Sequence, residues 1–308
     1  MTAPAPPPPD WIAADWGSSH LRAWGLAGDK VVRQAVSEQG AGQLSGDGFE
    51  DTLLALVRPW LADGRVTPVL ACGMVGSRQG WVEAAYRPVP CPPLGAPLTA
   101  APTRDARLSV QIVPGLSQTA PADVLRGEET QIAGWLAVNP GWDGVICLPG
   151  THSKWVHLSA GEVVSFQTFL TGEMFHLLSE RSVLRHSVAG WDAEGFAAGL
   201  AQGLERPDRL MARLFALRAE GLLQGLDPAQ TRARLSGLLI GAELAAARPY
   251  WLGQQVAVIG AGALAELYAK ALRGLSVPVT NPEAMALTLA GLGAARALLS
   301  ETVPPCAN

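Results

Sequence analysis

Short apolar runs separated by glycine-containing turns mark the beginning of the chain. Residues 17–19 and 27–29 each interrupt an apolar run, as turns between strands do. Apolar residues at helical spacing follow, and then one more short apolar run. The predicted elements are strands over 11–15, 21–26 and 30–36, a helix over 49–62 and a strand over 69–72. This part of the chain is therefore predicted to form two hairpin turns, a helix and a strand.

The same order of elements returns in the second half of the chain. Gly150-Thr151 takes the place of Gly17-Ser18 and follows an apolar run as that pair does. Residues 160–162 likewise take the place of residues 27–29, and both offsets are 133 residues without a gap. The later half closes with a helix, a strand, a helix and a strand, predicted over 234–247, 256–259, 264–272 and 277–279.

Two interpretations of this similarity are open. Turns of glycine and a small polar residue are common between strands, so a chance match is one of them. The gapless spacing and the shared order of elements favour the other, a duplicated domain. We therefore predict an α/β protein of two duplicated lobes that face one another across a cleft. The expected division is a disordered Pro-rich tail over 1–10, an N-terminal lobe over 11–125, and a C-terminal lobe over 126–308 whose last helix is a candidate to pack on the first lobe.

The composition of the 308 residues narrows the class of protein. Hydrophobic residues make up 48%, enough for a sizeable core, and charged residues 16%, with a formal net charge of -4. That balance gives no general attraction for nucleic acid or for an acidic membrane surface. The N-terminus lacks the basic start and apolar run of a signal peptide, and no apolar stretch is as long as a membrane span. Four widely spaced cysteines predict reduced thiols and no zinc site, so we expect a soluble, cytoplasmic protein.

The two glycine turns are the first candidates for ligand binding. Glycine lets backbone N–H groups approach phosphate oxygens and neighbouring hydroxyl groups add donors, so a polyphosphate ligand suits a pair of such turns. Asp15, at the end of the first strand, is placed to hold magnesium through water, and a turn cap is the alternative. The candidate phosphate-binding residues are Gly17, Ser18, Ser19, Arg22, Gly150, Thr151, His152 and Lys154. For Thr151 and Lys154, a polar turn and a solvated strand remain the alternative.

A third glycine segment lies near the end of the chain. Residues 259–267 are predicted to form the end of a strand, a glycine turn and a helix, an arrangement that often contacts nucleotides. Gly260, Gly262 and Ala265 also fit the dinucleotide fingerprint, but the remaining chain supplies too few strands for a dehydrogenase. Gly260, Ala261 and Gly262 are therefore candidate nucleotide contacts, with plain packing of strand against helix as the alternative.

Two glutamates open a predicted helix between the repeats. Glu128 and Glu129 lie in its first turn, where the helix dipole favours carboxylates, so an effect on stability alone is one interpretation. Their place at the junction of the predicted lobes makes them candidates for a general base, because transfer to a hydroxyl needs a carboxylate that orients the alcohol and accepts its proton. Adjacent helical residues point about 100° apart, so only one of the two is expected to face the cleft.

The residues after a further strand are candidates for substrate contact. The segment 73–81 directly follows the strand predicted over 69–72, and ligands of α/β sheets tend to bind where strands end. A purely structural loop is the alternative. The candidate substrate contacts are Gly73, Met74, Val75, Gly76, Ser77, Arg78, Trp81, Tyr86, Arg126, Thr171 and Glu173. His176 and His186 lie on apolar helical stretches and are expected to be packed.

Taken together, these segments resemble the 2-dehydro-3-deoxygalactonokinase family. The resemblance rests on residues 15–24, 71–81, 126–131, 148–156 and 170–173, and continues through 236–244 and the Gly260–Gly262 segment. It implies the fold of the sugar kinase and actin-like ATPase superfamily, with duplicated ribonuclease-H-like lobes. It also implies phosphorylation of 2-dehydro-3-deoxy-D-galactonate on its 6-hydroxyl by ATP with magnesium, in galactonate catabolism.

The resemblance further implies roles for the matching residues. Asp15, Gly17 and Ser18 match the first phosphate loop, Gly150, Thr151 and Lys154 the second, and Gly260 and Gly262 the adenosine side. In this superfamily the base is usually an aspartate just before the second phosphate turn, and Glu129 lines up with it better than Glu128. Ala85 and Ala261 stand where proline and threonine are expected, which leaves details of the loop and of the adenine contact open.

Three other functions are kept as alternatives. They are a kinase of a related 2-oxo-3-deoxy sugar acid, a phosphate-releasing hydrolase of the same superfamily, and a non-enzymatic ATPase module. ATP turnover without a sugar acid would favour the hydrolase, and the absence of a partner-binding insertion argues against the module. The expected partners are the sugar acid and, as a candidate homodimer, a second copy of the chain, but neither nucleic acid nor a membrane.

Overall fold

The computed structural model describes residues 7–301, with side chains described as far as Leu299. Contacts divide the chain into two compact units: unit 1 comprises residues 1–142, 159–164 and 284–308, and unit 2 comprises residues 143–158 and 165–283. The expected boundary at 125/126 is therefore placed differently, since residues 126–142 and the C-terminal segment both belong to unit 1. Most of the expected Pro-rich tail lies outside the described residues.

Unit 1 is built on a six-stranded mixed sheet in the order β3-β2-β1-β4-β7-β6. The first strand pairs antiparallel with the second and parallel with the fourth, and the strands predicted over the beginning of the chain are confirmed. The strands are β1 (Trp11–Trp16), β2 (Leu21–Ala27), β3 (Lys30–Ser37), β4 (Thr67–Gly73), β6 (Thr99–Ala101) and β7 (Leu108–Ile112). A smaller sheet of β5 (Arg87–Pro88), β8 (Leu116–Thr119) and β9 (Ala122–Leu125) was not anticipated from the sequence.

Alternation along β1 gives this sheet two buried faces. Ile12, Ala14 and Trp16 pack into one apolar cluster with helix α1 (Gly48–Val57), whereas Trp11 and Ala13 pack into another with the C-terminal helix α9 (Ala284–Glu301). Successive side chains of a strand point to opposite faces, so a strand buried on both sides reads as one continuous apolar run. Both faces of the sheet are therefore covered by helices from distant parts of the sequence.

Helix α1 is shorter than predicted. It ends at Val57, and residues 58–60 continue as a 3-10 turn in place of the helix expected to 62. Pro59 lacks a backbone N–H and disfavours α-helical geometry in the residue before it, which ends a regular helix at this point.

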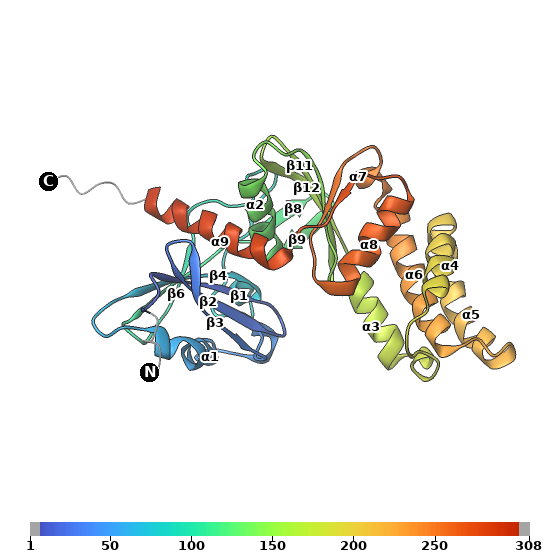
Figure 1. The fold of residues 1–308 in the computed structure, drawn as a ribbon, viewed down its shortest axis with the longest axis horizontal. Coiled ribbons are helices and arrows are strands. Elements are labelled where there is room, and N and C mark those ends of the chain that lie inside the picture. Colours follow the sequence, from blue (N-terminus) through green and yellow to red (C-terminus); the bar gives the residue numbers. More distant parts are fainter. Residues whose placement is uncertain (1–6, 302–308) are drawn as a thin grey trace, which may run out of the picture. The chain divides into compact units, whose positions relative to one another are not determined.

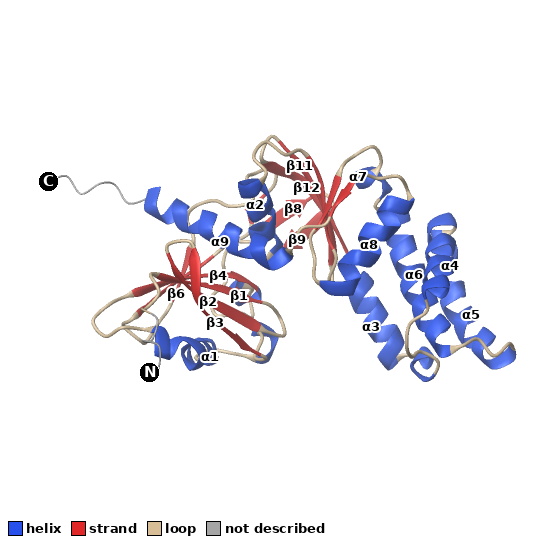
Figure 2. Cartoon of the chain, viewed as in Figure 1, coloured by secondary structure: helices blue, strands red, loops and turns tan. Residues whose placement is uncertain are grey.

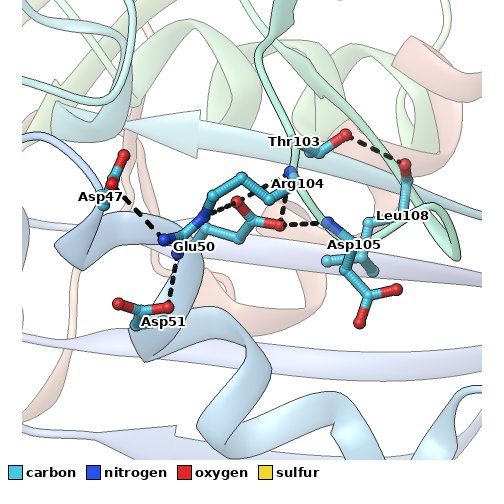
Figure 3. A network of polar contacts seen from close by, with 7 residues as sticks. All are labelled: Asp47, Glu50, Asp51, Thr103, Arg104, Asp105 and Leu108. Carbon is cyan, nitrogen blue, oxygen red and sulfur yellow. Dashed lines mark hydrogen bonds and ion pairs between the residues drawn. The ribbon is translucent and has the colours of Figure 1, made fainter.

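A buried carboxylate ties α1 to the loop between β6 and β7. Glu50 is 2% exposed and accepts the backbone N–H groups of Arg104 and Asp105, each at 2.8 Å (Figure 3). Its Oε2 also accepts Nε of Arg104 at 2.9 Å. Burial raises the pKa of Glu50, but the hydrogen bonds from these donors outweigh it and leave the pKa below its ordinary value. Glu50 is thus a structural carboxylate whose partners all lie on one loop.

Helix α2 (Glu128–Val138) lies directly against α9 (Figure 1). A methyl group added to Gly291 would overlap the carbonyl oxygen of Thr130, and one added to Gly134 would overlap that of Leu287. The two backbones therefore approach more closely than a side chain at either glycine would allow. Gln131 Nε2 also donates to Thr288 Oγ1 at 3.3 Å across this contact. The start of α2 is thus held in place by a helix more than a hundred residues later in the chain.

Unit 2 repeats the strand arrangement of unit 1. Its sheet has the order β12-β11-β10-β13-β14, in which β10 pairs antiparallel with β11 and parallel with β13. This matches the pairing of β1 with β2 and with β4, so the prediction of a duplicated α/β domain is confirmed. The strands are β10 (Gly144–Leu148), β11 (Ser153–Ser159), β12 (Glu162–Phe169), β13 (Val256–Val258) and β14 (Val279–Thr280).

Helices make up much of unit 2, and α4, α5 and α6 lie side by side (Figure 2). The helices are α3 (Thr171–Arg181), α4 (Ala193–Glu205), α5 (Leu210–Leu223), α6 (Pro228–Ala246), α7 (Arg248–Trp251) and α8 (Gly262–Gly274). Helix α6 begins six residues before the prediction because Asp227 caps the N–H groups of Ala229 and Gln230, and Pro228 fits the first helical position. Of the helices within residues 7–301, none has both the length and the apolar composition needed to cross a membrane.

The close contact of α2 with α9 predicts that an added methyl group is tolerated at one glycine of α9 and not at another. Gly291→Ala should lower stability by about 1–3 kcal/mol, because α9 must move away from Thr130. Gly293 has open space around it, so Gly293→Ala should be neutral or should stabilise by up to about 1 kcal/mol through better helix propensity. Thermal unfolding of both variants measures the difference, and equal melting temperatures would contradict this account of the contact.

Candidate functional site

Two strand ends and a helix start meet in unit 1. Asp15 on β1 is the register partner of Cys72 on β4, and Trp16 is the partner of Gly73. Gly127, with φ of 104°, precedes α2 and lies so close to Gly73 that a methyl group on it would come within 3.2 Å of the Gly73 Cα. The carboxyl ends of parallel strands, where α/β proteins commonly bind ligands, are therefore joined by the N-terminus of a helix.

Asp15 is the carboxylate at the end of β1, and its side chain is 24% exposed. Its Oδ2 lies 3.4 Å from Arg22 Nη1, and its Oδ1 lies 4.0 Å from the Cys72 sulfur. Burial raises the pKa of Asp15, Arg22 lowers it, and the nearby charge of Glu128 raises it again, with a net upward shift. A carboxylate that stays accessible beside a second carboxylate is suited to a hydrated cation.

Glu129 is fully buried behind the helix start. Its Oε2 accepts the N–H of Gly127 at 2.6 Å and its Oε1 accepts the Thr130 hydroxyl at 3.0 Å. Burial, and secondarily the charge of Glu128, raise the pKa of Glu129 from 4.5 to about 8. At neutral pH this side chain is therefore largely protonated and turned away from solvent.

Glu128 has the opposite environment. Its side chain is only partly buried, and its Oε2 accepts the backbone N–H of Arg126 at 2.9 Å. It also lies close enough to Asp15 to affect the pKa of that residue. Of the two adjacent glutamates, Glu128 is therefore the one accessible to solvent.

Arg126 connects the helix start to the loop after β4. Its side chain is buried, its Nη2 donates to the Ala84 carbonyl at 2.7 Å, and its guanidinium lies 4.3 Å from the centre of the Tyr86 ring. A cation over an aromatic face is an attractive contact, so Arg126 holds the 84–86 loop beside the turn that contains Gly76.

The remaining candidates on the loop after β4 separate into two groups. Val75 is fully buried, and Trp81 packs against Trp16 and Phe49, so these side chains belong to the core of unit 1. Arg78 is largely exposed and pairs with Glu83 at 3.4 Å. The part of this loop that lies at the strand ends is the turn formed by Gly73, Met74, Val75, Gly76 and Ser77.

The second glycine turn lies in unit 2, between β10 and β11. The start of α3 packs directly on it, since a methyl group on Gly172 would overlap the carbonyl oxygen of Gly150. Glu173 donates its backbone N–H to the Thr151 carbonyl at 2.8 Å, and its carboxylate lies 2.6 Å from His152 Nε2. Lys154 is buried and donates to the His152 carbonyl at 3.2 Å. Thr171 and Glu173 thus lie beside the second glycine turn.

A cavity of about 860 Å3 opens within unit 2. Gly150 and Thr151 line one part of it, and the N-terminus of α8, which begins at Gly262, lines another. Backbone N–H groups at a helix N-terminus favour phosphate groups, so both features suit a nucleotide. The other walls of the cavity come from α3, α6, α8 and the loop before α4, and they include Phe175, Trp191, Arg232, Ser236 and Glu266.

Sequence reasoning missed these other walls, because no local pattern links residues so far apart. The guanidinium of Arg232 lies 5.4 Å from the centre of the Phe175 ring, and Glu266 accepts Asn281 Nδ2 at 2.7 Å. The expectation that His176 and His186 are packed is wrong, since both are exposed. His176 instead lies 3.5 Å from Glu180, one turn further along the exposed face of α3.

The residues present are compatible with magnesium but not with a protein-only metal cage. Within residues 7–301, no group of three or more His, Cys, Asp or Glu side chains is arranged to hold a metal ion. Magnesium is usually bound by one or two carboxylates and several waters, together with substrate phosphates. The accessible carboxylates of Asp15 and Glu128 fit that requirement.

Relatives with assigned functions match nearly the whole chain. A probable 2-dehydro-3-deoxygalactonokinase of Rhizobium meliloti (strain 1021) is 37% identical over 298 residues, covering 92% of this chain and 96% of that protein. The 2-dehydro-3-deoxygalactonokinase of Escherichia coli (strain K12) is 37% identical over 277 residues, covering 88% and 91%.

Solved structures give the same result for the fold. A candidate 2-dehydro-3-deoxygalactonokinase from Sinorhizobium meliloti superposes with a TM-score of 0.84 at 35% identity, covering 94% of this chain and 99% of that chain. The activator of 2-hydroxyisocaproyl-CoA dehydratase from Clostridium difficile has a TM-score of 0.53 at 12% identity, covering 96% and 99%, and shares the fold alone. The family model of 2-keto-3-deoxy-galactonokinase matches residues 15–295, and the chain belongs to that family.

Proposed function

We propose that this protein transfers the γ-phosphoryl group of ATP to the 6-hydroxyl of 2-dehydro-3-deoxy-D-galactonate, with magnesium, in galactonate catabolism. The family match and two relatives at 37% identity support the reaction. The observation that carries the chemistry is the pair of accessible carboxylates, Asp15 and Glu128, at the strand ends of unit 1. The nucleotide-sized cavity of unit 2 supports the other half of the reaction.

Asp15 is the proposed magnesium ligand, through water. When bound, magnesium neutralises charge on the phosphoryl group during transfer. The Asp15 carboxylate is held by Arg22 on the neighbouring strand, which limits its freedom without closing it to solvent. Its position at the end of β1, next to the first glycine turn, supports a role beside phosphate oxygens bound at Gly17, Ser18 and Ser19.

Glu128 is the proposed general base. The backbone N–H of Arg126 fixes one of its oxygens, and its partial exposure leaves it accessible to a hydroxyl group. The resemblance to the superfamily favoured Glu129, but that side chain is fully buried and both of its oxygens accept hydrogen bonds. A protonated Glu129 carries no charge and therefore adds no repulsion at the neighbouring carboxyl groups.

The nucleotide is assigned to the cavity of unit 2. Gly150, Thr151 and His152 are proposed to contact phosphate oxygens, with Lys154 beside them, and Gly260, Ala261 and Gly262 to contact the adenosine. Thr171 and Glu173 were expected to contact the sugar acid, but their place against the Gly150–Thr151 turn supports a role on the nucleotide side. The sugar acid is assigned to the turn of residues 73–77 and to Tyr86, which Arg126 holds in place.

This assignment predicts that ADP release depends on the acceptor. In a coupled assay over a panel of 2-oxo-3-deoxy sugar acids, 2-dehydro-3-deoxy-D-galactonate should give the highest kcat/KM, and magnesium should be required. A higher kcat/KM for another sugar acid in the panel would move the proposal to that substrate. ATP turnover at the same rate without any sugar acid would support a phosphate-releasing enzyme instead.

The two glutamates should respond differently to the loss of their charge. Glu128→Gln should lower kcat by about 10²–10⁴-fold, because the amide cannot accept the hydroxyl proton. Glu129→Gln imitates the protonated side chain and should keep most of the turnover. The matched comparison uses the same assay and the same substitution at neighbouring positions. A large loss of kcat in Glu129→Gln together with normal turnover in Glu128→Gln would reverse the assignment.

The raised pKa of Glu129 also predicts a dependence of stability on pH. Between about pH 4.5 and about pH 8, the folded protein keeps a proton on Glu129 that the unfolded chain has lost. The unfolded state then binds fewer protons, so the contribution of Glu129 to stability is fully present below pH 4.5 and decreases as the pH rises towards 8. The side chain introduced by Glu129→Gln does not titrate. The melting temperature of this variant should therefore increase relative to that of the wild type as the pH rises. Parallel curves of melting temperature against pH would contradict the buried, protonated state.

A further inference from the structure

A second buried carboxylate, in unit 2, has no part in the reaction as proposed. Glu243 lies on α6 and is 3% exposed. It falls in residues 236–244, a segment that resembles the kinase family but to which the sequence assigned no role. An ionisable group buried in an apolar cluster is costly unless its hydrogen bonds are satisfied. Its surroundings therefore require an explanation.

Hydrogen-bond donors surround both oxygens of Glu243. Trp155 Nε1 donates to Oε1 at 2.8 Å, and the Tyr268 hydroxyl donates to Oε2 at 2.7 Å. Thr171 and Ser153 also donate hydrogen bonds to this carboxyl group. Ser153 Oγ lies 3.1 Å from the Tyr268 oxygen as well, and the hydroxyl of Tyr268 has a single proton. The hydroxyl of Ser153 also has a single proton, so Ser153 donates either to Glu243 or to the Tyr268 oxygen while Tyr268 donates to Glu243.

The donors come from the elements that enclose the cavity. Ser153 and Trp155 lie on β11, immediately after the Gly150–Thr151 turn, and Thr171 opens α3. Tyr268 lies on α8 and itself lines the cavity, as Thr171 does. Glu243 is on α6, whose residues Ser236, Leu239 and Ile240 form another wall. One carboxyl group thus joins α3, α6 and α8, which line the cavity, to the strand that follows the Gly150–Thr151 turn.

These contacts also fix the position of the Gly150–Thr151 turn relative to α8. Trp155 and Ser153 are both fully buried, so neither side chain has room to take another position. The start of α3 is held twice, by Thr171 on Glu243 and by the N–H of Glu173 on the Thr151 carbonyl. A change at Glu243 would therefore reach the backbone groups of the turn through two separate connections.

We propose that Glu243 is a positioning residue for the nucleotide, which holds the Gly150–Thr151 turn, the start of α3 and helix α8 in the arrangement that binds ATP. The inference rests on the proposed assignment of this cavity to the nucleotide. Glu243 touches no reacting atom; it acts through Trp155, Tyr268, Ser153 and Thr171. Its loss should therefore weaken ATP binding and leave the KM for the sugar acid almost unchanged.

The test uses Glu243→Gln, with Glu50→Gln as a matched control in unit 1. Glu50 is equally buried and equally rich in hydrogen bonds, but its partners lie on the 103–105 loop and none of them lines the cavity. In Glu243→Gln the amide nitrogen cannot accept the proton of Tyr268, so one side of the network must rearrange while the bond from Trp155 is retained. The measurements are the Kd of a non-hydrolysable ATP analogue by calorimetry, the KM for each substrate, and the melting temperature.

The expected result separates positioning from stability. Glu243→Gln should raise the Kd for the analogue and the KM for ATP by about tenfold or more, as misplaced binding groups do. Glu50→Gln should lower the melting temperature and leave both constants at wild-type values. A Glu243→Gln protein that loses melting temperature but binds the analogue as tightly as the wild type would overturn the inference.

Two further outcomes are informative. If Glu243→Gln does not fold, Trp155→Phe removes a single donor and keeps the carboxylate, and it should weaken analogue binding in the same direction. Unchanged binding in Trp155→Phe would then count against the inference. The second outcome concerns the cavity itself. If the wild type phosphorylates the sugar acid but a substitution that lines the cavity, such as Gly150→Val, leaves analogue binding unchanged, the nucleotide assignment and the inference with it are wrong.

Discussion

The contact between Gly73 and Gly127 is the constraint on which the chemistry of unit 1 depends. It lets a helix begin directly beside the ends of two parallel strands, so that backbone N–H groups, an accessible carboxylate and a buried one are gathered within a few residues. The buried carboxyl of Glu129 satisfies the N–H of Gly127, which has no partner inside the helix. Glu128, the other carboxylate of this helix start, is only partly buried and stays accessible to solvent.

The duplication gives the two units one strand arrangement but different chemistry. The residue 133 positions after Asp15 is Leu148, which is buried, so the acidic group at the end of the first strand has no counterpart at the end of β10. Unit 2 instead has a basic residue, Lys154, next to its glycine turn and a cavity behind it. The repeat thus supplies two similar turns, and the residues around them decide which is suited to a cation and which to a nucleotide.

Local sequence patterns were enough to predict the strands, the glycine turns, the duplication and the start of α2. They were enough because alternation, turn residues and acidic first turns act over only a few positions. The prediction failed where the outcome depends on distant residues. Nothing local distinguishes Glu128 from Glu129, since burial of the second depends on its place behind the ends of β1 and β4. The cavity walls at Phe175 and Arg232 likewise follow from the packing of α3 and α6. The early end of α1, by contrast, could have been predicted from Pro59.

The docking of α9 on α2 has a consequence for how the protein is made. Gln131 and Thr288 are 157 positions apart, and the whole of unit 2 lies between the two helices in the sequence. During synthesis, the helix that carries Glu128 emerges from the ribosome long before the helix that covers it. Contacts between such distant segments are expected to form late, because closing the long intervening loop costs conformational entropy. Unit 1 is therefore completed last, although most of it is synthesised first, and a ribosome that stops before residue 284 leaves an apolar face of its sheet uncovered.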